Sequence, residues 1–324
     1  MPAAQNGGGQ APSKRQLALS WREEDIISVY KQTPALKPDG FAVTGFGFPS
    51  QQQPDAHVKF GLPAILKPEL QNHEYVFRAL RDMPPDKTRG IRIPEIYRTF
   101  ESNGKLFIVM EYIPGKTLHQ LTGQKGWESQ QAALTNSIAR AMKLFMSIPV
   151  PAEQKPGPVG GGYIRHSLFK DDTSACVYSS IDELENHLNR VRNYTGPPSI
   201  NATSFLTVAD TNTAQVARLT NENAPTVTLE RSLCFYYSDF YASNFIFTDS
   251  GDICVIDFDQ AGFLPPSLMS YAVAESHWYP GLWLKDVLKL PEHNLPAMKQ
   301  IHYFFIICSH LIGLPRPPKK RRQY

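Results

Sequence analysis

Short apolar strands and two helices dominate the predicted architecture of the first third of the chain. Apolar positions alternate or run together in four short segments, and in a fifth they recur at mixed helical spacing. The predicted elements are a helix at 21–30 opened by Ser20, strands at 41–48 and 57–60, a helix at 69–81, and a hairpin of strands 93–100 and 106–110 around the turn 102–104. This order predicts a small α+β lobe that ends near residue 112.

The remainder of the chain is richer in helical patterns. Residues 130–146 carry their apolar side chains on one face, which predicts an amphipathic helix that Pro149 and Pro151 end. Other expected elements are an irregular Pro- and Gly-rich segment at 152–173, a helix capped by Ser180 with Glu183 completing a capping box, a loop at 193–205, a helix at 215–220, and helices within 267–311.

A hairpin pattern in the second half brings candidate chemistry together. Residues 245–247 are typical of a short buried strand, residues 249–252 are turn formers, and residues 253–256 predict the returning strand. Two buried strands joined by a turn would place Asn244, before the first strand, close to Asp257, after the second.

Asp239, Asn244 and Asp257 are spaced like the catalytic base and the two metal ligands of a phosphoryl-transfer site. An Asp on a short loop can accept the proton of an attacking hydroxyl, while an Asn and an Asp can hold Mg²⁺ against the phosphates of ATP. Each residue alone is better explained as a turn former or a strand-end carboxylate. The ordered set favours the chemical interpretation.

Lys59 is the candidate cation for the phosphates. It lies between apolar neighbours in a predicted strand, where an unpaired ammonium would be costly. Glu74 on the following helix is the expected partner, and Glu69 is an alternative that the sequence leaves open. The simpler explanation is an edge-strand Lys that points into solvent.

The segment 110–115 is expected to join the two lobes and to hold a nucleobase. An extended linker exposes N–H and C=O groups that can pair with an adenine edge, and the side chains of Met110 and Ile113 could sandwich its ring. The candidate contacts are therefore Met110, Glu111, Tyr112 and Ile113. A strand end followed by a Pro-Gly turn explains the same residues. The glycines of residues 45–47 could let a loop approach phosphates, or form a simple turn.

Composition limits the function classes. The chain has 324 residues, enough for one large or two cooperating domains, with 42% hydrophobic and 19% charged residues as in soluble globular proteins. Five basic residues near the C-terminus account for more than the whole net charge of +3, so the rest is slightly acidic and does not suggest nucleic-acid binding. The four scattered cysteines argue against a zinc site and against a disulfide framework.

No apolar run approaches the length of a membrane span, and the N-terminus lacks the apolar core of a secretory signal. We therefore expect a cytoplasmic protein without a membrane partner. The basic tail, with Lys319, Lys320, Arg321 and Arg322, could act as a nuclear import signal, although a plain solvated tail is favoured.

Taken in order, these features resemble the aminoglycoside phosphotransferase and choline kinase-like family, a branch of the protein-kinase-like fold, and in particular its fungal members of unassigned substrate. The similarity extends from about residue 40 to about residue 310, and its most specific parts are residues 238–244 and 255–266. The resemblance implies a two-lobed α+β fold with ATP and Mg²⁺ as cofactors. It also implies Asp239 as the catalytic base, Asn244 and Asp257 as Mg²⁺ ligands, Lys59 at the α- and β-phosphates, and Glu74 orienting Lys59.

We therefore expect four segments: a disordered tail (1–16), a nucleotide-binding N-lobe (17–112), a C-lobe with the catalytic loop, metal site and acceptor site (113–314), and a basic tail (315–324). The long segment 152–230 lies where this family builds its acceptor site. The leading hypothesis is an ATP- and Mg²⁺-dependent transfer of the γ-phosphate to a hydroxyl of an unidentified small molecule.

One departure from the family pattern supports an alternative. Tyr237 and Ser238 precede Asp239 where the family has His and Gly. An aromatic Tyr could pack the loop as the His does, whereas a Ser would dislike a backbone angle that only Gly adopts readily. The alternative hypothesis is a pseudokinase that binds nucleotide or a partner without turnover.

Overall fold

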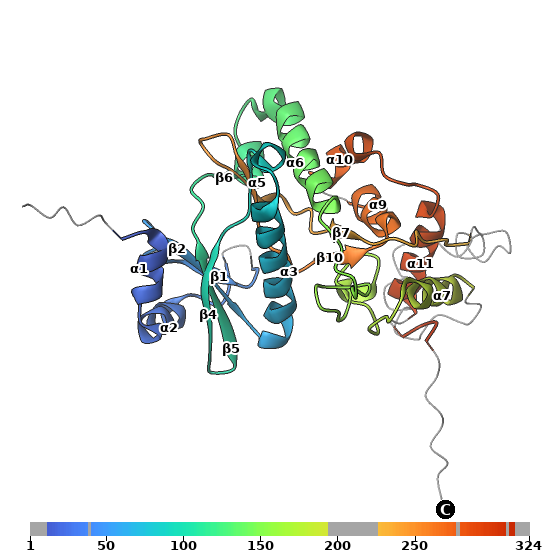
Figure 1. The fold of residues 1–324 in the computed structure, drawn as a ribbon, viewed down its shortest axis with the longest axis horizontal. Coiled ribbons are helices and arrows are strands. Elements are labelled where there is room, and N and C mark those ends of the chain that lie inside the picture. The colour runs from blue at the N-terminus through green and yellow to red at the C-terminus, as the bar shows by residue number, and fades with distance from the viewer. Residues whose placement is uncertain (1–11, 38–39, 194–225, 277–278, 309–310, 315–324) are drawn as a thin grey trace, which may run out of the picture.

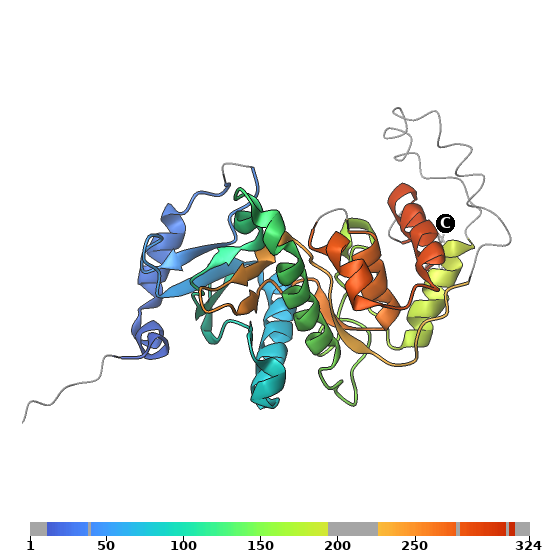
Figure 2. The same ribbon diagram turned by 90° about the horizontal axis from the view of Figure 1, so that it is seen from above.

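The computed structural model describes residues 12–37, 40–193, 226–276, 279–308 and 311–314. Two lobes lie side by side along the long axis, with the helix α3 (Pro63–Asp82) standing between them in both views (Figures 1 and 2). The N-lobe is built on a β-sheet, and the C-lobe is mainly helical. The predicted two-lobed α+β fold is confirmed.

The N-lobe sheet has the strand order β1-β2-β5-β4, and every neighbouring pair is antiparallel. One face packs on two N-terminal helices through Ile26, Phe46 and Val58, and the other packs towards α3 through Ile108 and Met110. The elements are α1 (Lys14–Ser20), α2 (Glu23–Gln32), β1 (Gly45–Phe48), β2 (Ala56–Gly61), α4 (Pro85–Thr88), β3 (Ile91–Arg92), β4 (Ile96–Ser102) and β5 (Lys105–Glu111).

The C-lobe surrounds two small sheets with helices. Its elements are β6 (Lys116–Thr117), α5 (Leu118–Thr122), η1 (Trp127–Gln130), α6 (Gln131–Met146), η2 (Lys170–Asp172), α7 (Ile181–Arg192), β7 (Cys234–Tyr237), η5 (Ala242–Asn244), β8 (Phe245–Phe247), β9 (Ile253–Val255), β10 (Ala261–Leu264), α9 (Pro266–Ala274), α10 (Gly281–Leu288) and α11 (Leu295–Ile307). Strand β7 pairs with β10, and the second sheet has the order β3-β9-β8-β6.

Strand β3 crosses the expected lobe boundary. Residues 91–92, which precede residue 112, pair in parallel with β9 of the C-lobe. The Ile253 N–H donates to the carbonyl of Gly90 just before this pair. The N-lobe is therefore attached to the C-lobe at a second point besides the linker at 110–115.

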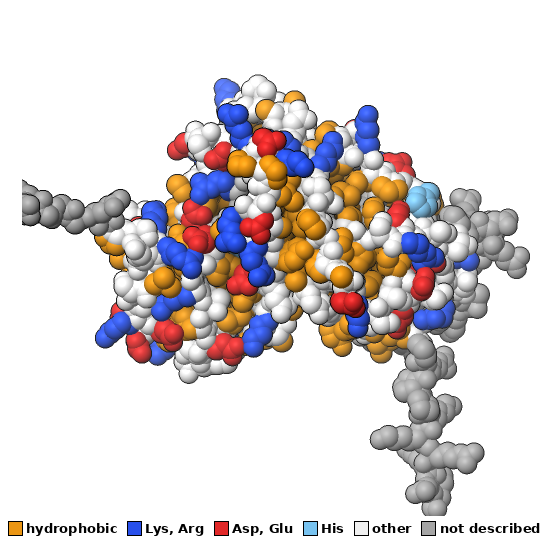
Figure 3. Space-filling view, in the orientation of Figure 1, with side chains coloured by type: hydrophobic (Ala, Val, Ile, Leu, Met, Phe, Trp, Pro, Cys, Tyr) orange, Lys and Arg blue, Asp and Glu red, His pale blue; other side chains and the backbone are white. Residues whose placement is uncertain are grey.

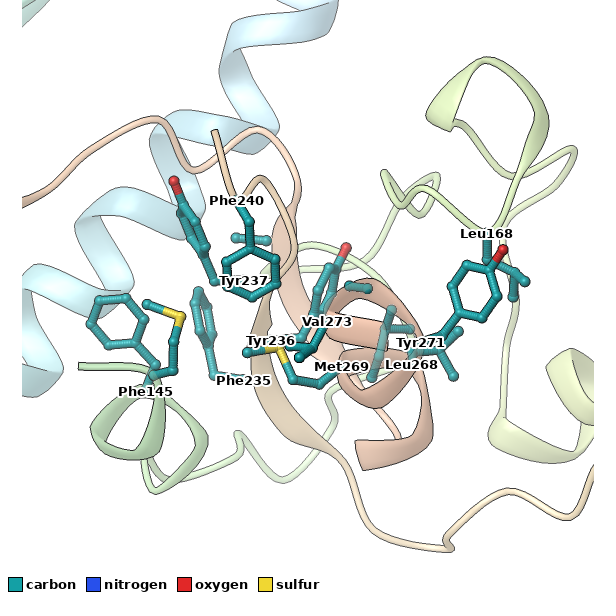
Figure 4. Packing of buried hydrophobic residues seen from close by; sticks show 14 of the residues in the cluster. Phe145, Leu168, Phe235, Tyr236, Tyr237, Phe240, Leu268, Met269, Tyr271 and Val273 are labelled. Carbon is teal, nitrogen blue, oxygen red and sulfur yellow. The ribbon is translucent and has the colours of Figure 1, made fainter. Parts of the chain in front are cut away.

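Side chains of β7 alternate between two parts of the C-lobe core. Phe235 and Tyr237 point towards Phe145 of α6, whereas Tyr236 lies on the side of Met269 (Figure 4). Both tyrosines are fully buried. The strand that leads into the catalytic loop is thus fixed on both faces by aromatic packing.

Most predicted elements are confirmed, and their errors lie at the ends. Helix α1 begins at Lys14, inside the predicted disordered tail, and α3 begins six residues before the predicted start. Arg22, and not Ser20, precedes the first residue of α2. Ser180 caps α7 as predicted, but the Glu183 carboxylate accepts from the Ser179 N–H, so the capping box is not formed. The helix predicted at 215–220, nearly all of the loop 193–205, and the basic tail lie outside the described residues.

The charge pattern of the surface and the length of the helices bear on nucleic-acid and membrane partners. On the face shown in Figure 3, Lys and Arg side chains are interspersed with Asp and Glu side chains. Among the helices of the described ranges, none is both long and apolar enough to cross a bilayer.

The buried His166 links the stability of the C-lobe to pH. Its Nδ1 accepts from the Leu168 N–H at 3.0 Å and its Nε2 lies 2.9 Å from the Leu268 carbonyl oxygen, so the ring is neutral with its proton on Nε2. Burial lowers the pKa of His166 to about 4. In the unfolded chain, the His166 ring binds a second proton near pH 6.5. The neutral buried ring therefore contributes fully to the free energy of unfolding above pH 6.5, and this contribution is lost as the pH falls towards 4.

We expect the free energy of unfolding to decrease between pH 6.5 and 4, and His166→Gln to reduce that decrease by up to about 1.4 kcal/mol per pH unit. Denaturant unfolding at several pH values measures both slopes. The exposed His119 on α5 provides the matched control His119→Gln, which should leave the slope unchanged. Equal slopes in wild type and His166→Gln would contradict the assignment.

Candidate active site

The loop after β7 brings Asp239 and Asn244 into contact. The Asn244 side-chain amide donates to Asp239 Oδ2 at 2.8 Å and to the Asp239 carbonyl at 3.3 Å. Asn244 ends the short helix η5, and its N–H donates to the Tyr241 carbonyl. Two residues five positions apart thus form one hydrogen-bonded unit, as their spacing predicted.

The hairpin β8–β9 carries Asp257 to the same place. Phe245 pairs with Val255, and the Ile256 N–H donates to the Asn244 carbonyl at 3.0 Å. Asp257 itself adopts a left-handed backbone conformation with φ of 62°, which is uncommon for a residue other than Gly. The predicted proximity of Asn244 and Asp257 is confirmed by this geometry.

Lys59 of β2 binds two carboxylates across the space between the lobes. Its ammonium lies 2.6 Å from Glu69 Oε1 and 3.0 Å from Asp257 Oδ1. Its side chain is only 15% exposed, so the alternative of a solvated edge-strand Lys is wrong.

The predicted partner Glu74 is wrong, because it lies exposed on another side of α3. Glu69, the alternative, is the partner, and its side chain is 5% exposed. Five residues along an α-helix turn the chain by about 500°, which is about 140° beyond one full turn. Glu69 and Glu74 therefore point to different faces of α3.

The charged groups of this cluster change one another's pKa values. Burial alone would lower the pKa of Lys59, but Glu69 and Asp257 more than offset it and raise this pKa above its ordinary value. Burial, helped by the neighbouring Asp257, raises the pKa of the Glu69 carboxyl. Burial and the Asp257 carboxylate raise the pKa of Asp239 to about 7, although the Asn244 hydrogen bond opposes this change. A carboxyl group with a pKa near neutrality suits proton transfer.

A cavity of about 280 Å³ lies between the lobes and contains most of the predicted contacts. Lys59, Met110, Glu111, Tyr112, Ile113, Asn244 and Asp257 line it, whereas Asp239 does not. The sequence did not predict the remaining lining residues, which are Lys37, Thr44, His57, Glu69 (named only as an alternative partner of Lys59), His73, Pro94, Ser243, Ile246 and Ile256.

The linker after β5 offers backbone groups to this cavity. The Glu111 N–H donates to the Glu95 carbonyl, and the Glu111 carboxylate binds Arg92 at 2.6 Å. Glu111 is therefore engaged in holding the linker. Within the described part of the chain, the N–H groups of Tyr112 and Ile113 have no hydrogen-bond partner.

The glycines 45 and 47 do not form the predicted phosphate loop. Both lie inside β1, where Gly45 pairs with Lys59 and Gly47 with His57. Their role is to leave space on the cavity face of the sheet, since a Cβ at either position would clash with a neighbouring side chain.

Tyr237 and Ser238 support the catalytic loop despite their departure from the family pattern. The Tyr237 hydroxyl donates to the Ile256 carbonyl at 2.7 Å, directly before Asp257, and its ring packs on Phe245 and Phe258. Ser238 has no positive φ, and its N–H donates to the Gln260 carbonyl. The backbone angle that would disfavour Ser is therefore not required here.

We expect Tyr237→Phe to destabilise the fold by about 1–3 kcal/mol, because the Ile256 carbonyl would lose its donor in a buried setting. Turnover should fall as well, since Asp257 follows that carbonyl. The matched control is Tyr236→Phe, because Tyr236 is equally buried and donates to the Arg165 carbonyl at 2.9 Å. Thermal unfolding and ADP release measure the two effects. Equal losses of turnover in both variants would contradict a specific role for Tyr237.

Helix α3, which carries Glu69, is attached to the C-lobe by the buried Asn72. The Asn72 amide donates to the carbonyls of Phe258 and Ala261, and its oxygen accepts from the Val159 N–H at 2.8 Å. One turn later the Tyr75 hydroxyl donates to the Pro149 carbonyl. The position of Glu69 relative to Asp257 is thus set by contacts to the C-lobe.

The oxygen atoms of Asn244 and Asp257 fit a magnesium ion. Because the Asn244 amide nitrogen donates to Asp239, its amide oxygen points away from that carboxylate. Asp257 uses Oδ1 for Lys59, which leaves Oδ2. Carboxylate and amide oxygens are ligands that Mg²⁺ accepts, together with phosphates and water. Neither here nor elsewhere do the described ranges contain a group of three or more His, Cys, Asp or Glu side chains placed to hold a metal ion.

Aligned solved structures include a thermostable mutant of aminoglycoside phosphotransferase APH(4)-Ia (16% identity, 77% of this chain and 76% of that chain, TM-score 0.45) and the streptomycin-ATP-APH(2")-IIa ternary complex (16%, 91% and 99%, TM-score 0.47). A putative fructosamine-3-kinase from Haemophilus somnus also aligns (11%, 81% and 79%, TM-score 0.41). None of the curated proteins matches the chain.

The family model described as "Phosphotransferase enzyme family" matches residues 55–268. This match covers more than half of the chain and includes every site residue from Lys59 to Asp257. The chain therefore belongs to the phosphotransferase enzyme family.

Proposed function

We propose that this phosphotransferase moves the γ-phosphate of ATP to a hydroxyl group of a small-molecule acceptor, with Mg²⁺ as the metal. The observation that carries this proposal is the position of Lys59, whose ammonium joins Glu69 of α3 to Asp257 of the C-lobe in the wall of the cavity. A fixed cation beside an Asn and an Asp is what a triphosphate and its metal require.

Each residue has a defined task in this proposal. Lys59 binds the α- and β-phosphates and neutralises part of their charge, while Glu69 keeps its ammonium in place. Asn244 and Asp257 would hold Mg²⁺, which supplies charge neutralisation at the phosphates when bound. The N–H groups of Tyr112 and Ile113 would pair with the nucleobase edge.

Asp239 orients the acceptor hydroxyl and accepts its proton at a carboxylate oxygen. Asn244 holds that carboxylate through its amide nitrogen at 2.8 Å. Asp239 does not line the nucleotide cavity, and we assign its carboxylate to the acceptor side of the transferred phosphate. This is the side from which an acceptor must approach for in-line transfer.

The acceptor site is expected to include part of the segment 152–230. From the described part of this segment, Arg165 reaches the site and binds Asp259 at 2.8 Å, two residues beyond Asp257. The acceptor is proposed to contact this region. The charge and shape of residues 163–174 would then contribute to its selection.

Ligand-dependent thermal unfolding tests the nucleotide part of the proposal. We expect MgATP to raise the unfolding temperature of the wild type, with a stabilisation of about 2.7 kcal/mol at a hundredfold excess over the Kd. Asp257→Ala should abolish the increase, whereas Asp249→Ala, in the exposed turn of the same hairpin, should retain it. A wild type that MgATP does not stabilise would contradict the proposal.

The pseudokinase hypothesis depended on Tyr237 and Ser238 alone. Tyr237 now has a supporting hydrogen bond and Ser238 has an unstrained backbone, so no observation favours that hypothesis. Release of ADP by the wild type with a panel of hydroxyl acceptors would establish turnover. Nucleotide binding without any ADP release would restore the alternative.

A further inference from the structure

His57 occupies a particular position in the wall of the nucleotide cavity. Along β2, Ala56 and Val58 are fully buried against the helices α1 and α2, so His57 and Lys59 share the opposite face and line the cavity. In the register with β5, His57 lies opposite Met110, the last residue before the linker positions 111–113. Its side chain is therefore between the phosphate-binding Lys59 and the candidate base-binding linker.

The imidazole of His57 extends over the strand β1. A Cβ placed on Gly45 would lie 2.4 Å from His57 Nε2, which is closer than real atoms approach. Gly45 thus provides the space in which the ring lies. The wall above the cavity consists of a flat ring next to two glycines.

The ring is uncharged and has no fixed partner. Burial, together with the adjacent Lys59 ammonium, lowers the pKa of His57 to about 4, so the imidazole is neutral at physiological pH. Among the described residues, no side chain or backbone group forms a hydrogen bond with it. A neutral ring interacts with a ligand through its face and not through charge.

The C-lobe side of the cavity contributes two apolar side chains beside the polar Ser243, Asn244 and Asp257. Ile246 of β8 and Ile256, which directly precedes Asp257, line it from the C-lobe. A flat ring that enters between the lobes would therefore have His57 on one face and two isoleucines on the other. Its edge would face the unpaired N–H groups of Tyr112 and Ile113.

We propose that His57 is the residue that stacks on the nucleobase of the bound nucleoside triphosphate and so selects a purine. This inference rests on the proposed function, because it assumes that the cavity binds a nucleotide. A purine has a larger stacking face than a pyrimidine, so the preference follows from the ring itself. Ile246 and Ile256 would contact the opposite face of the base, and neither has a flat ring that could take the place of His57.

Equilibrium binding of three ligands to the full chain tests this assignment. The ligands are MgATP, MgCTP, and magnesium tripolyphosphate, which has the phosphates without a base. Wild type should bind ATP more tightly than CTP. His57→Ala should weaken ATP binding about tenfold and leave tripolyphosphate binding unchanged, because the lost contact is with the base. His57→Phe, which keeps a flat ring, should retain ATP affinity within about threefold.

Two controls keep the result interpretable. His119→Ala removes an exposed histidine from α5 and should bind all three ligands like the wild type. Unchanged tripolyphosphate binding shows that the phosphate site of His57→Ala is folded.

The contrary outcomes are distinct from one another. Equal weakening of ATP and tripolyphosphate in His57→Ala, unchanged ATP affinity, or a loss in His57→Phe as large as in His57→Ala would each overturn stacking on the base. A wild type that binds none of the three ligands would overturn the proposed function and this assignment with it.

Discussion

Replacing Asp239 with Asn is expected to reduce phosphate transfer by about 10²–10⁴-fold while leaving the Kd for MgATP within about threefold of the wild type. Asn can still accept the 2.8 Å hydrogen bond from Asn244 through its amide oxygen, so the loop should keep its geometry. The amide cannot accept a proton from a hydroxyl. The variant therefore isolates proton transfer from nucleotide binding.

ADP release under saturating MgATP measures the rate, and calorimetric titration measures the affinity. Asp249→Asn makes the same chemical change in the exposed turn between β8 and β9, so it should have wild-type rate and affinity. Full activity of Asp239→Asn would remove Asp239 from the mechanism. A parallel loss of MgATP affinity would indicate a role in binding instead.

Replacing Glu69 with Gln is expected to lower kcat/KM for ATP roughly tenfold or more and to destabilise the fold by about 1–3 kcal/mol. The loss of this carboxylate leaves the buried Lys59 ammonium with Asp257 as its remaining ion-pair partner. The ammonium would then be drawn towards the C-lobe and away from the phosphates. The destabilisation should be smaller than for an isolated buried pair because Asp257 remains.

Helix α3 supplies the matched control for this experiment. Glu74→Gln makes the identical change on the same helix at an exposed position and should alter neither kinetics nor stability by a measurable amount. Kinetics at several ATP concentrations and denaturant unfolding provide the two readouts. If Glu74→Gln were the damaging variant, the ion pair with Glu69 would not be the functional one.

The β-hairpins were the most predictable parts of the fold. In β4–β5 and β8–β9, strong strand formers flank turn residues such as Asn103 and Gly104, and local sequence decides both the strands and their register. Because Asn244 and Asp257 lie at the two ends of such a hairpin, their proximity was also predictable. Asp239, the proposed base, lies only five residues from Asn244, so local chain geometry was enough to predict that the two residues are close.

The rotation of α3 was not predictable from apolar periodicity. Three polar residues, Glu69, Asn72 and His73, share its buried face with Leu66 and Val76. Glu74 was favoured because it lies on the helix that follows Lys59, as the Glu of the kinase Lys–Glu pair does, and it is exposed. Glu69 has its partner on β2, Asn72 has its partners in the C-lobe, and His73 contacts the Pro94 carbonyl, so only long-range contacts reveal which side of the helix faces the site.

The sequence did not predict the cavity residues outside the motifs, because their positions also depend on long-range contacts. His57 is an ordinary strand residue until the sheet register places it opposite Met110, and Thr44 is an ordinary polar residue directly before β1. The strand predicted at 41–48 contains Gly45, but the sequence alone left a phosphate loop or a turn open there, because it does not show that a strand position must remain without a side chain. The alternation of β2 was predicted, but the face that meets the cavity was not.

The attachment of α3 through Asn72 has a consequence for regulation. In a kinase whose equivalent helix can swing outwards, the Lys–Glu pair is broken in the resting state and an activating event restores it. Here an outward movement of α3 would break the hydrogen bonds between the buried Asn72 side chain and its three backbone partners. Each buried group left without a partner would cost about 1–3 kcal/mol. We infer that the Lys59–Glu69 pair is already formed in the enzyme without ligands. The rate of phosphate transfer would then depend on the concentrations of nucleotide and acceptor and not on a movement of α3.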